Sequence, residues 1–255
     1  MAITGATGSK RLSLYLLMGQ SNMSGRGKVQ AIDRRTHPRI FMLDAQLRWR
    51  PAREPVHFDK PGRCGTGPAM AFARVMAKQD PEAIIGLIPC SVGGSPLEKW
   101  QKGVELYKTA IARAELACQS GELAGILWHH GETDSIHEET ARTYGTRLYR
   151  MISNLRQDLG CPGLVVVVGG LGDFLTDRIE RKWLHLVNAA LESLPTVVTS
   201  TAYVDASGLG PGEDGLHFSA QAARELGRRY AQAMLSLAKI SKERIRSASK
   251  VGLSI

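Results

Sequence analysis

The sequence predicts a single α/β domain built on a mainly parallel β-sheet. Short apolar segments rich in Val, Ile and Leu alternate with longer segments of helical periodicity along the chain. Most of these apolar segments lack polar alternation, which is typical of strands that are buried on both faces. Strand–helix alternation of this kind favours a parallel sheet with helices on both sides. Because the chain has no linker, repeat or low-complexity segment, one domain spanning residues 1–255 is expected.

The expected elements follow from these patterns. Strands are predicted at residues 12–18, 39–43, 83–89, 124–128, 164–168 and 196–204. Helices are predicted at residues 68–78, 104–119, 138–159, 177–193 and 220–237. In the third of these helices Tyr144, Leu148 and Met151 recur at helical spacing and define one apolar face. Residues 44–67 are rich in Arg, Pro and Gly and have no periodicity, so they are expected to form a long loop that serves as a lid or binding wall.

The net charge of +9 does not by itself indicate a partner. Part of the excess lies in a basic C-terminal tail, about residues 239–255. No nucleic-acid motif accompanies it, so a solvated surface is the simpler interpretation and no nucleic-acid partner is expected. No apolar run approaches the roughly 20 residues that span a bilayer, and no cleavage site follows residues 12–18. We therefore predict a cytoplasmic protein without a membrane partner; the oligomeric state is left open.

Cysteine usage points away from a metal or disulfide framework. Four cysteines lie far apart, at positions 64, 90, 118 and 161, without a C-x-x-C pair. Such spacing matches neither a zinc cluster nor the disulfide pattern of a small secreted domain. No metal or other cofactor is expected from it.

Small and reactive residues follow several of the predicted strands. Residues 19–27 follow the first strand, residues 90–96 the third, residues 129–134 the fourth and residues 212–217 the last. In open parallel sheets, ligands bind outside the carboxyl ends of the strands. The sequence therefore predicts an active site at this one edge of the sheet.

Ser21, His217 and Asp214 have the chemistry of a serine hydrolase. A serine hydroxyl attacks an acyl carbon when a neighbouring base removes its proton, and a third group improves that base by fixing its tautomer. Asp214 precedes His217 by three positions, which allows its carboxylate to reach the ring nitrogen that faces away from Ser21. The oxyanion needs preorganised donors, and the backbone N–H groups of Ser21 and of the Gly93–Gly94 turn are candidates.

Four sequence blocks resemble those of the SGNH hydrolases grouped as carbohydrate esterase family six and the sialate O-acetylesterases. The blocks are residues 17–27, 88–95, 128–134 and 214–217, and the match runs in order over roughly residues 12–235. The resemblance implies a flavodoxin-like three-layer α/β/α sandwich. It also implies a serine esterase, free of metal and cofactor, that removes O-acetyl groups from a saccharide of the acetylxylan or sialate type.

The resemblance assigns roles to individual residues. It places the nucleophile at Ser21, the base at His217 and its orienting carboxylate at Asp214, with oxyanion N–H groups at Ser21 and at Gly93 or Gly94. Within the same blocks, the residues expected to bind substrate are Gln20, Asn22, Arg26 and Glu132.

One position departs from the family pattern. The third block usually carries glutamine immediately before Gly-Glu, and here that position is His130. A histidine N–H can donate from the same place, so His130 is predicted as the side-chain donor of the oxyanion hole. The alternative is that His130 packs beneath the loop and the glycine N–H groups suffice.

Three other functions are alternatives to the esterase. The cluster at residues 129–137 contains His129, His130, Glu132, Asp134 and His137, which suits a metal-dependent hydrolase. Its spacing matches no known zinc arrangement, and adjacent residues leaving a strand point to opposite faces. A catalytically inactive carbohydrate-binding homologue is a second alternative, because a fold does not determine a function. The P-loop-like residues 5–10 precede a strand instead of following one, so nucleotide binding is disfavoured.

Overall fold

A seven-stranded sheet forms the centre of the molecule in the computed structural model, which describes residues 11–251 and the side chains as far as residue 239. The strands are β1 (Leu12–Gly19), β2 (Ile40–Leu43), β3 (Trp49–Pro51), β4 (Ile84–Pro89), β5 (Gly121–His129), β6 (Val166–Gly169) and β7 (Thr201–Val204). Their order is β3-β2-β4-β1-β5-β6-β7, and all neighbours pair in parallel except β2 and β3. Without the edge pair β2–β3 this is the flavodoxin order, so the predicted fold class is confirmed.

The helices surround this sheet. They are α1 (Ser21–Ser24), α2 (Ala69–Gln79), η1 (Leu97–Trp100), α3 (Glu105–Cys118), α4 (Glu138–Arg142), α5 (Tyr144–Asp158), η2 (Asp173–Leu175), η3 (Ile179–Arg181), α6 (Leu184–Val197) and α7 (Ala220–Val251). In the described part of the chain, no helix is both long enough and apolar enough to cross a membrane.

Several expected boundaries differ from the observed ones. The helix predicted at 138–159 is two helices that meet at Thr143. The helix predicted at 177–193 begins only at Leu184 and then continues to Val197, so the last strand starts five residues later than predicted, at Thr201. The predicted loop 44–67 contains the short strand β3, whose Arg and Pro content gave no strand signal. Helix α7 continues to Val251 and so includes the backbone of the basic tail up to that residue, whereas the P-loop-like residues 5–10 and residues 252–255 lie outside the described residues.

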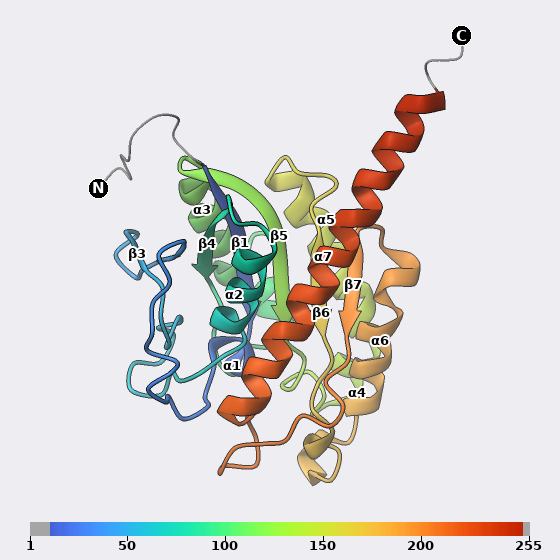
Figure 1. The fold of residues 1–255 in the computed structure, drawn as a ribbon. Helices are drawn as coiled ribbons and strands as arrows, with labels where there is room; N and C mark the ends of the chain where they lie inside the picture. The colour runs from blue at the N-terminus through green and yellow to red at the C-terminus, as the bar shows by residue number, and fades with distance from the viewer. Residues whose placement is uncertain (1–10, 252–255) are drawn as a thin grey trace.

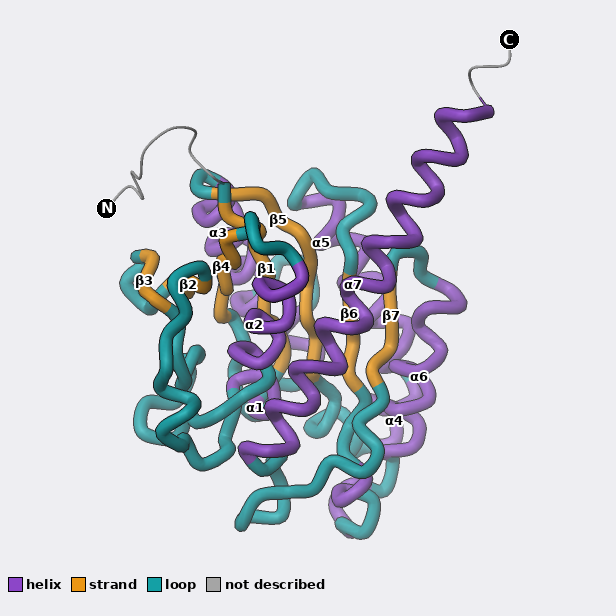
Figure 2. The backbone as a smooth tube through the Cα atoms, in the orientation of Figure 1, coloured by secondary structure: helices purple, strands orange, loops and turns teal. Residues whose placement is uncertain are grey.

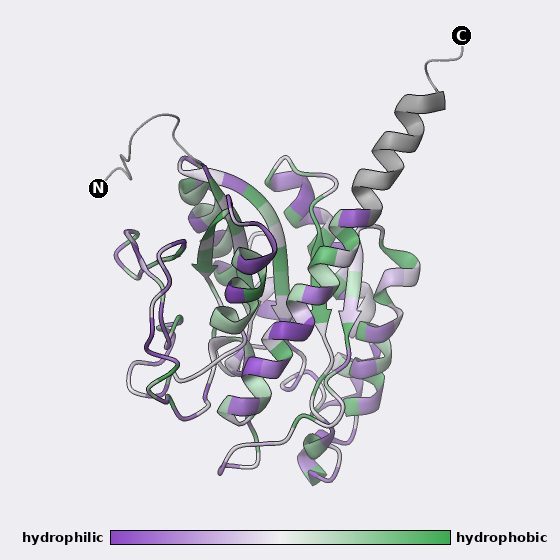
Figure 3. Ribbon diagram, viewed as in Figure 1, coloured by the Kyte–Doolittle hydropathy of each residue, from purple (hydrophilic) through white to green (hydrophobic). Residues whose placement is uncertain are grey.

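The core lies on both faces of the sheet. Along β1, Leu14 and Leu16 pack into the cluster that contains α3, α5 and α6, whereas Tyr15 and Leu17 pack into the cluster that contains α2 and α7. Figure 1 shows α2 and α7 crossing one face of the sheet. In Figure 3 the central strands are mainly green and the helices carry purple residues on their outer sides. Burial of both faces explains the unbroken apolar segments of the sequence.

Loops gather at the carboxyl ends of the strands, the lower end of the molecule in Figure 2. Strands β1 and β5 are neighbours at the centre of the sheet. After β1 the chain forms β2, β3 and β4 on one side of this pair, and after β5 it forms β6 and β7 on the other side. This is the switch point at which open α/β sheets bind ligands. The segments that follow β1 and β5 therefore meet at the expected place for a site.

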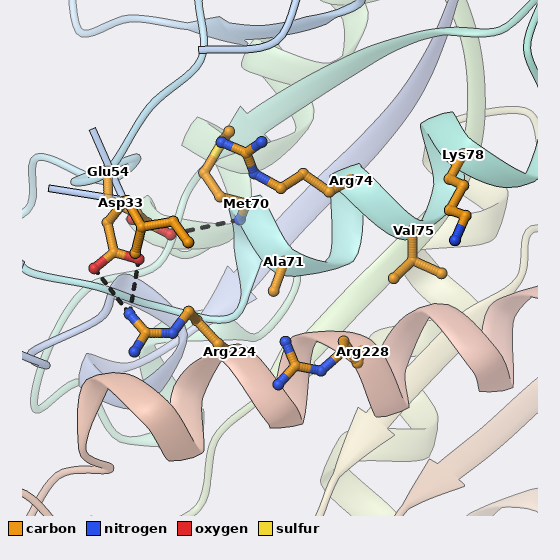
Figure 4. Close-up of a pocket in the computed structure, with 10 residues that line it drawn as sticks. Asp33, Glu54, Met70, Ala71, Arg74, Val75, Lys78, Arg224 and Arg228 are labelled. Carbon is orange, nitrogen blue, oxygen red and sulfur yellow. Dashed lines mark hydrogen bonds and ion pairs between the residues drawn. The ribbon is translucent and has the colours of Figure 1, made fainter. Parts of the chain in front are cut away.

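The long segment between β1 and α2 is anchored by buried carboxylates. Asp33 accepts two hydrogen bonds of 2.9 Å from the Arg224 guanidinium of α7 and one of 3.0 Å from the Thr66 hydroxyl. Glu54 accepts the N–H groups of Val56 and Met70, the latter at the start of α2 (Figure 4). These contacts hold the segment against α2 and α7.

Glu54 is expected to make stability fall as the pH rises. Burial raises the pKa of its carboxyl from 4.5 to about 8, although backbone N–H groups partly oppose this shift. Between those two values the folded protein keeps a proton that the unfolded chain releases, so the free energy of unfolding decreases with pH, by about 5 kcal/mol in total. Glu54→Gln cannot ionise, so denaturant unfolding from pH 5 to pH 9 should show a flatter dependence for this variant. The exposed Glu98→Gln is the control; identical slopes for Glu54→Gln and wild type would contradict the prediction.

Candidate active site

Ser21, His217 and Asp214 form one chain of hydrogen bonds. The Nε2 atom of His217 lies 2.9 Å from Oγ of Ser21, and its Nδ1 atom lies 2.6 Å from Oδ2 of Asp214. The other Asp214 oxygen accepts the backbone N–H groups of Leu216 and His217, both at 2.9 Å. The three residues come from positions 21, 214 and 217, so the fold brings together the trio that the sequence predicted.

The charge state of Asp214 determines which atoms donate and which accept in this chain of hydrogen bonds. Burial by itself would raise the pKa of Asp214, but hydrogen bonds from the His217 ring and from two backbone N–H groups lower it to about 2. An ionised carboxylate only accepts, so Nδ1 of His217 carries the proton that it donates to Asp214. In the neutral form of the ring Nε2 is then the acceptor, and it faces the Ser21 hydroxyl. This is the arrangement in which histidine can take the serine proton.

The turn that presents Ser21 depends on Gly19. This residue ends β1 with φ of +130°, and a Cβ there would lie 2.0 Å from the carbonyl oxygen of His129. The neighbouring Gln20 donates its N–H to that same carbonyl, so β1 stays on β5 until one residue before the serine. Ser21 then begins the short helix α1. An N–H in the first turn of a helix has no acceptor within the helix, and that of Ser21 has none elsewhere among the described residues, so it is available to a ligand.

Asn22 and Glu132 connect the separate blocks of the site. The Asn22 amide donates to Oε1 of Glu132 at 2.6 Å and accepts the N–H of Phe218 at 3.0 Å. Asn22 was expected to bind substrate, but both ends of its buried amide are used within the protein. It instead ties the turn of Ser21 to the segment that carries His217. Glu132 differs, because its second oxygen, Oε2, is buried without a hydrogen-bond partner in the described part of the chain.

Arg26 and Gly93 are also engaged within the protein. The guanidinium of Arg26 forms an ion pair of 2.8 Å with Asp59, and the N–H of Gly93 donates to the same Asp59 oxygen at 2.7 Å. Sequence reasoning expected Arg26 to bind substrate and Gly93 or Gly94 to donate to the oxyanion. The structure leaves Gly94 as the N–H candidate in this turn. Asp59 itself was not predicted, although the loop that carries it was expected to be functional.

His130 lies elsewhere than the sequence predicted. Its ring is fully buried between Trp128 and Tyr144, with centroid distances of 4.7 and 6.0 Å. Its Nε2 lies 2.8 Å from the carbonyl oxygen of Ser95, and its Nδ1 lies 3.2 Å from the Tyr144 hydroxyl. Both ring nitrogens are therefore occupied, and burial lowers the pKa of the ring, which favours its neutral form. The expected role as an oxyanion donor does not fit this position; the alternative of packing beneath the loop does.

The cluster at residues 129–137 does not converge on a point. His129 contacts the Tyr230 hydroxyl of α7, whereas His130 contacts Tyr144 of α5 on the opposite face of the sheet. Asp134 accepts the N–H of Leu97 and a guanidinium N–H of Arg147. Among the described residues, no group of three His, Cys, Asp or Glu side chains could hold a metal ion. The strand pleat separates the two histidines, as their adjacency predicted.

A pocket of about 160 Å³ opens beside Ser21. Its walls are Gln20, Ser21, Asn22, Arg26, Lys60, Arg63, Gly93, Gly94, Glu132, Thr133, Arg181, Leu216 and His217. Gln20 and Glu132, both expected to bind substrate, each keep one buried oxygen without a partner in the described chain. A second hollow of about 630 Å³ shares Arg26 and His217 with this pocket. His217 therefore borders both the pocket beside Ser21 and the second hollow.

Arg181 is the wall residue that sequence reasoning missed. Its Nε and Nη1 atoms are buried and have no hydrogen-bond partner in the part of the chain that the structure describes. Burial lowers the pKa of its guanidinium, and the charges of Glu132 and Glu180 oppose that shift. Arg181 lies in the stretch predicted as helix 177–193 and belongs to no motif, so the sequence carried no signal for it. Buried donors without acceptors at a pocket wall can bind oxygen atoms, of a ligand or of water.

Comparisons with known proteins identify the family. The family model described as "Carbohydrate esterase, sialic acid-specific acetylesterase" matches residues 11–236. The chain belongs to this carbohydrate esterase family. This carbohydrate esterase is 35% identical over 244 residues to a probable carbohydrate esterase of Arabidopsis thaliana, over 88% of this chain and 90% of that relative. The family resemblance predicted from the four blocks is thus confirmed, and the protein is a carboxylic ester hydrolase.

Solved structures agree with the family. An X-ray structure of an Arabidopsis thaliana protein matches this carbohydrate esterase with a TM-score of 0.81 at 33% identity, over 89% of this chain and 98% of that one. The crystal structure of NanS matches with a TM-score of 0.75 at 16% identity, over 92% and 99% of the two chains. A carbohydrate acetylesterase from Xanthomonas citri matches with a TM-score of 0.69 at 20% identity, over 89% of this chain and 57% of that one. The last two similarities establish a common fold.

Proposed function

We propose that this carbohydrate esterase hydrolyses O-acetyl esters of a saccharide through an acetyl-enzyme formed on Ser21. The observation that carries the proposal is the hydrogen-bond chain from Asp214 through His217 to the Ser21 hydroxyl, with contacts of 2.6 and 2.9 Å. A neutral histidine held in this tautomer is a general base for the serine. The pocket beside Ser21 has room for an acetyl group.

The reaction has two steps. Ser21 Oγ attacks the acetyl carbon while Nε2 of His217 takes the hydroxyl proton, and a tetrahedral intermediate forms. The C–O bond to the sugar then breaks, and the leaving oxygen takes the proton from His217, which leaves an acetylated Ser21. A water molecule repeats the attack with His217 as base and releases acetate. Asp214 stabilises the positive charge that His217 acquires in each step.

The positive charge of the pocket favours binding of a sugar that carries a carboxylate. Lys60, Arg63 and Arg181 line the pocket, and none of them forms an ion pair with another described residue. Glu132 is the acidic residue in this wall, and one of its oxygens is already bonded to Asn22. Acceptors on a neutral sugar would satisfy the Arg181 donors less strongly than a carboxylate, because charge-assisted hydrogen bonds are roughly twice as strong. We therefore propose that the substrate is of the sialate type rather than the acetylxylan type.

Arg181 is expected to determine this preference. Arg181→Ala should lower kcat/KM for O-acetylated sialic acid by roughly 10- to 100-fold, because a hydrogen bond to a charged group contributes about 1.5–3 kcal/mol. The loss should lie mainly in KM, and activity on p-nitrophenyl acetate, which has no carboxylate, should stay near that of wild type. Steady-state kinetics on both esters measures the difference.

The neighbouring Lys182→Ala is the matched control, because Lys182 is exposed and does not line the pocket. Equal losses of kcat/KM on both esters would show that Arg181 contributes to folding or to the chemical step and not to the choice of substrate. Faster hydrolysis of acetylated xylo-oligosaccharides than of acetylated sialic acid by the wild type would overturn the preference for the sialate type. A wild type inactive on every acetyl ester would overturn the proposed function.

A further inference from the structure

The turn that faces Ser21 leaves one N–H unused. Ser95 donates its N–H and its hydroxyl to the Val92 carbonyl, which closes a four-residue turn through Gly93 and Gly94. Gly94 has φ of +80°, as the third residue of a type II turn requires. The Val92 N–H is bonded to the Gly19 carbonyl, so the turn is attached directly to the end of β1. Of the N–H groups from Val92 to Ser95, that of Gly94 has no acceptor among the described residues.

A buried ion pair holds this turn from behind. One oxygen of Asp59 accepts the Gly93 N–H at 2.7 Å and an Arg26 N–H at 2.8 Å, and the two side chains are only 2% and 5% exposed. A Cβ on Gly93 would lie 2.5 Å from the Arg26 guanidinium, 3.0 Å from the Asp59 carboxylate and 3.4 Å from Cβ of Ser21. The glycine, the ion pair and the nucleophile are therefore in direct contact, and no side chain fits between them.

Both members of the pair are needed for electrostatic reasons. A carboxylate beside the oxyanion would oppose the negative charge that develops in the transition state, and that charge must be stabilised for catalysis. Arg26 neutralises Asp59, whose pKa burial would raise but which hydrogen bonds from Arg26, Cys64 and Gly93 lower to about 2. The ionised pair can thus fix the turn without adding net charge. Loss of one partner would leave the other charge buried and uncompensated.

We propose that Asp59 and Arg26 are a positioning pair, which binds the Gly93 N–H and thereby presents the Gly94 N–H, with that of Ser21, to the oxyanion. The inference rests on the proposed esterase function and adds to it a role for the long loop. In this role Asp59 acts through the turn and does not touch the substrate. A displaced donor weakens binding of the transition state more than binding of the ester, because the full charge exists only in the transition state.

The test is kinetic. Asp59→Ala is expected to lower kcat for p-nitrophenyl acetate by about 10- to 100-fold with KM within about 2-fold, since removal of a whole oxyanion donor costs about 10²–10³. Affinity for methylboronic acid, which forms a tetrahedral adduct with an active serine, should fall in parallel. Asp59→Asn keeps an oxygen acceptor for the Gly93 N–H and should recover a large part of kcat. If Asp59→Ala does not fold, the near-isosteric Asp59→Asn still has to show a lower kcat at unchanged KM.

The matched control is Asp44→Asn. Asp44 is at the start of the same loop and forms an ion pair with Arg50 at 3.0 Å, but this pair is on the surface and outside the pocket. Its kcat should equal that of wild type. The inference is overturned if folded Asp59→Ala has the kcat of wild type, or if KM alone changes. A wild type that hydrolyses no acetyl ester overturns the proposed function and this inference with it.

Discussion

Replacing Ser21 with alanine is expected to lower kcat for acetyl esters by at least ~10³. The hydroxyl lies 2.9 Å from Nε2 of His217, and without it no acetyl-enzyme can form. Only the binding groups and the backbone donors of the pocket would still act on an attacking water molecule. The measurement is kcat on p-nitrophenyl acetate together with intact-protein mass spectrometry after treatment with a serine-directed phosphonate. Wild type should gain one adduct, and Ser21→Ala should gain none.

Ser24→Ala is the control for labelling. Ser24 lies in the same short helix, but its hydroxyl is fully buried and hydrogen-bonded to Ser91 at 2.9 Å. This variant keeps Ser21 and should be labelled as wild type is. An adduct on Ser21→Ala, or activity retained by that variant, would show that another group is the nucleophile.

Replacing Asp214 with asparagine is expected to lower kcat by roughly 10²–10³ with little change in KM. The Asp214 carboxylate accepts the Nδ1 proton of His217 at 2.6 Å and so keeps Nε2 free as the base. An asparagine amide can turn its NH₂ toward the ring, which favours the opposite tautomer and removes the base from Ser21. The Asp214 side chain is 53% exposed, so water can partly replace it, and the loss should be smaller than for Ser21→Ala.

Glu213→Gln is the matched control for this charge change. Glu213 is the exposed neighbour of Asp214, and it is not part of the hydrogen-bond chain. Its kcat should stay within about 2-fold of wild type. If Asp214→Asn had the kcat of wild type, Asp214 would not orient His217, and the hydrogen bond between them would be structural only.

The position of the site could be predicted because its main signals are local. An apolar strand that ends at Gly19 and is followed by Ser21 can be recognised within ten residues of sequence, and Asp214 and His217 are three positions apart. Parallel strands expose their carboxyl ends at one edge, so residues that follow different strands were expected to meet. The structure places Ser21 and His217 in contact there.

The roles of the surrounding side chains could not be predicted in the same way. All four of the side chains expected to bind substrate line the pocket, but Asn22 and Arg26 are engaged with other residues of the protein, whereas Gln20 and Glu132 each keep one buried oxygen without a partner in the described chain. A sequence motif shows which residue stands near the nucleophile but does not show what else lies within hydrogen-bond distance. For Asn22 the partner is Glu132, 110 positions away.

The sequence by itself determined the α/β fold, the family and the three residues of the hydrogen-bond chain, because strand periodicity and short motifs depend on neighbouring residues. Only the tertiary structure decided the role of His130. Its ring nitrogens lie within hydrogen-bond distance of Ser95 and Tyr144, so they are not available to the oxyanion. The tertiary structure also decided that Asp59 binds the Gly93 N–H and that Arg181 enters the pocket. These outcomes depend on which face of a strand a side chain takes and on which loops pack together. Such contacts between distant segments form only when the whole chain is folded.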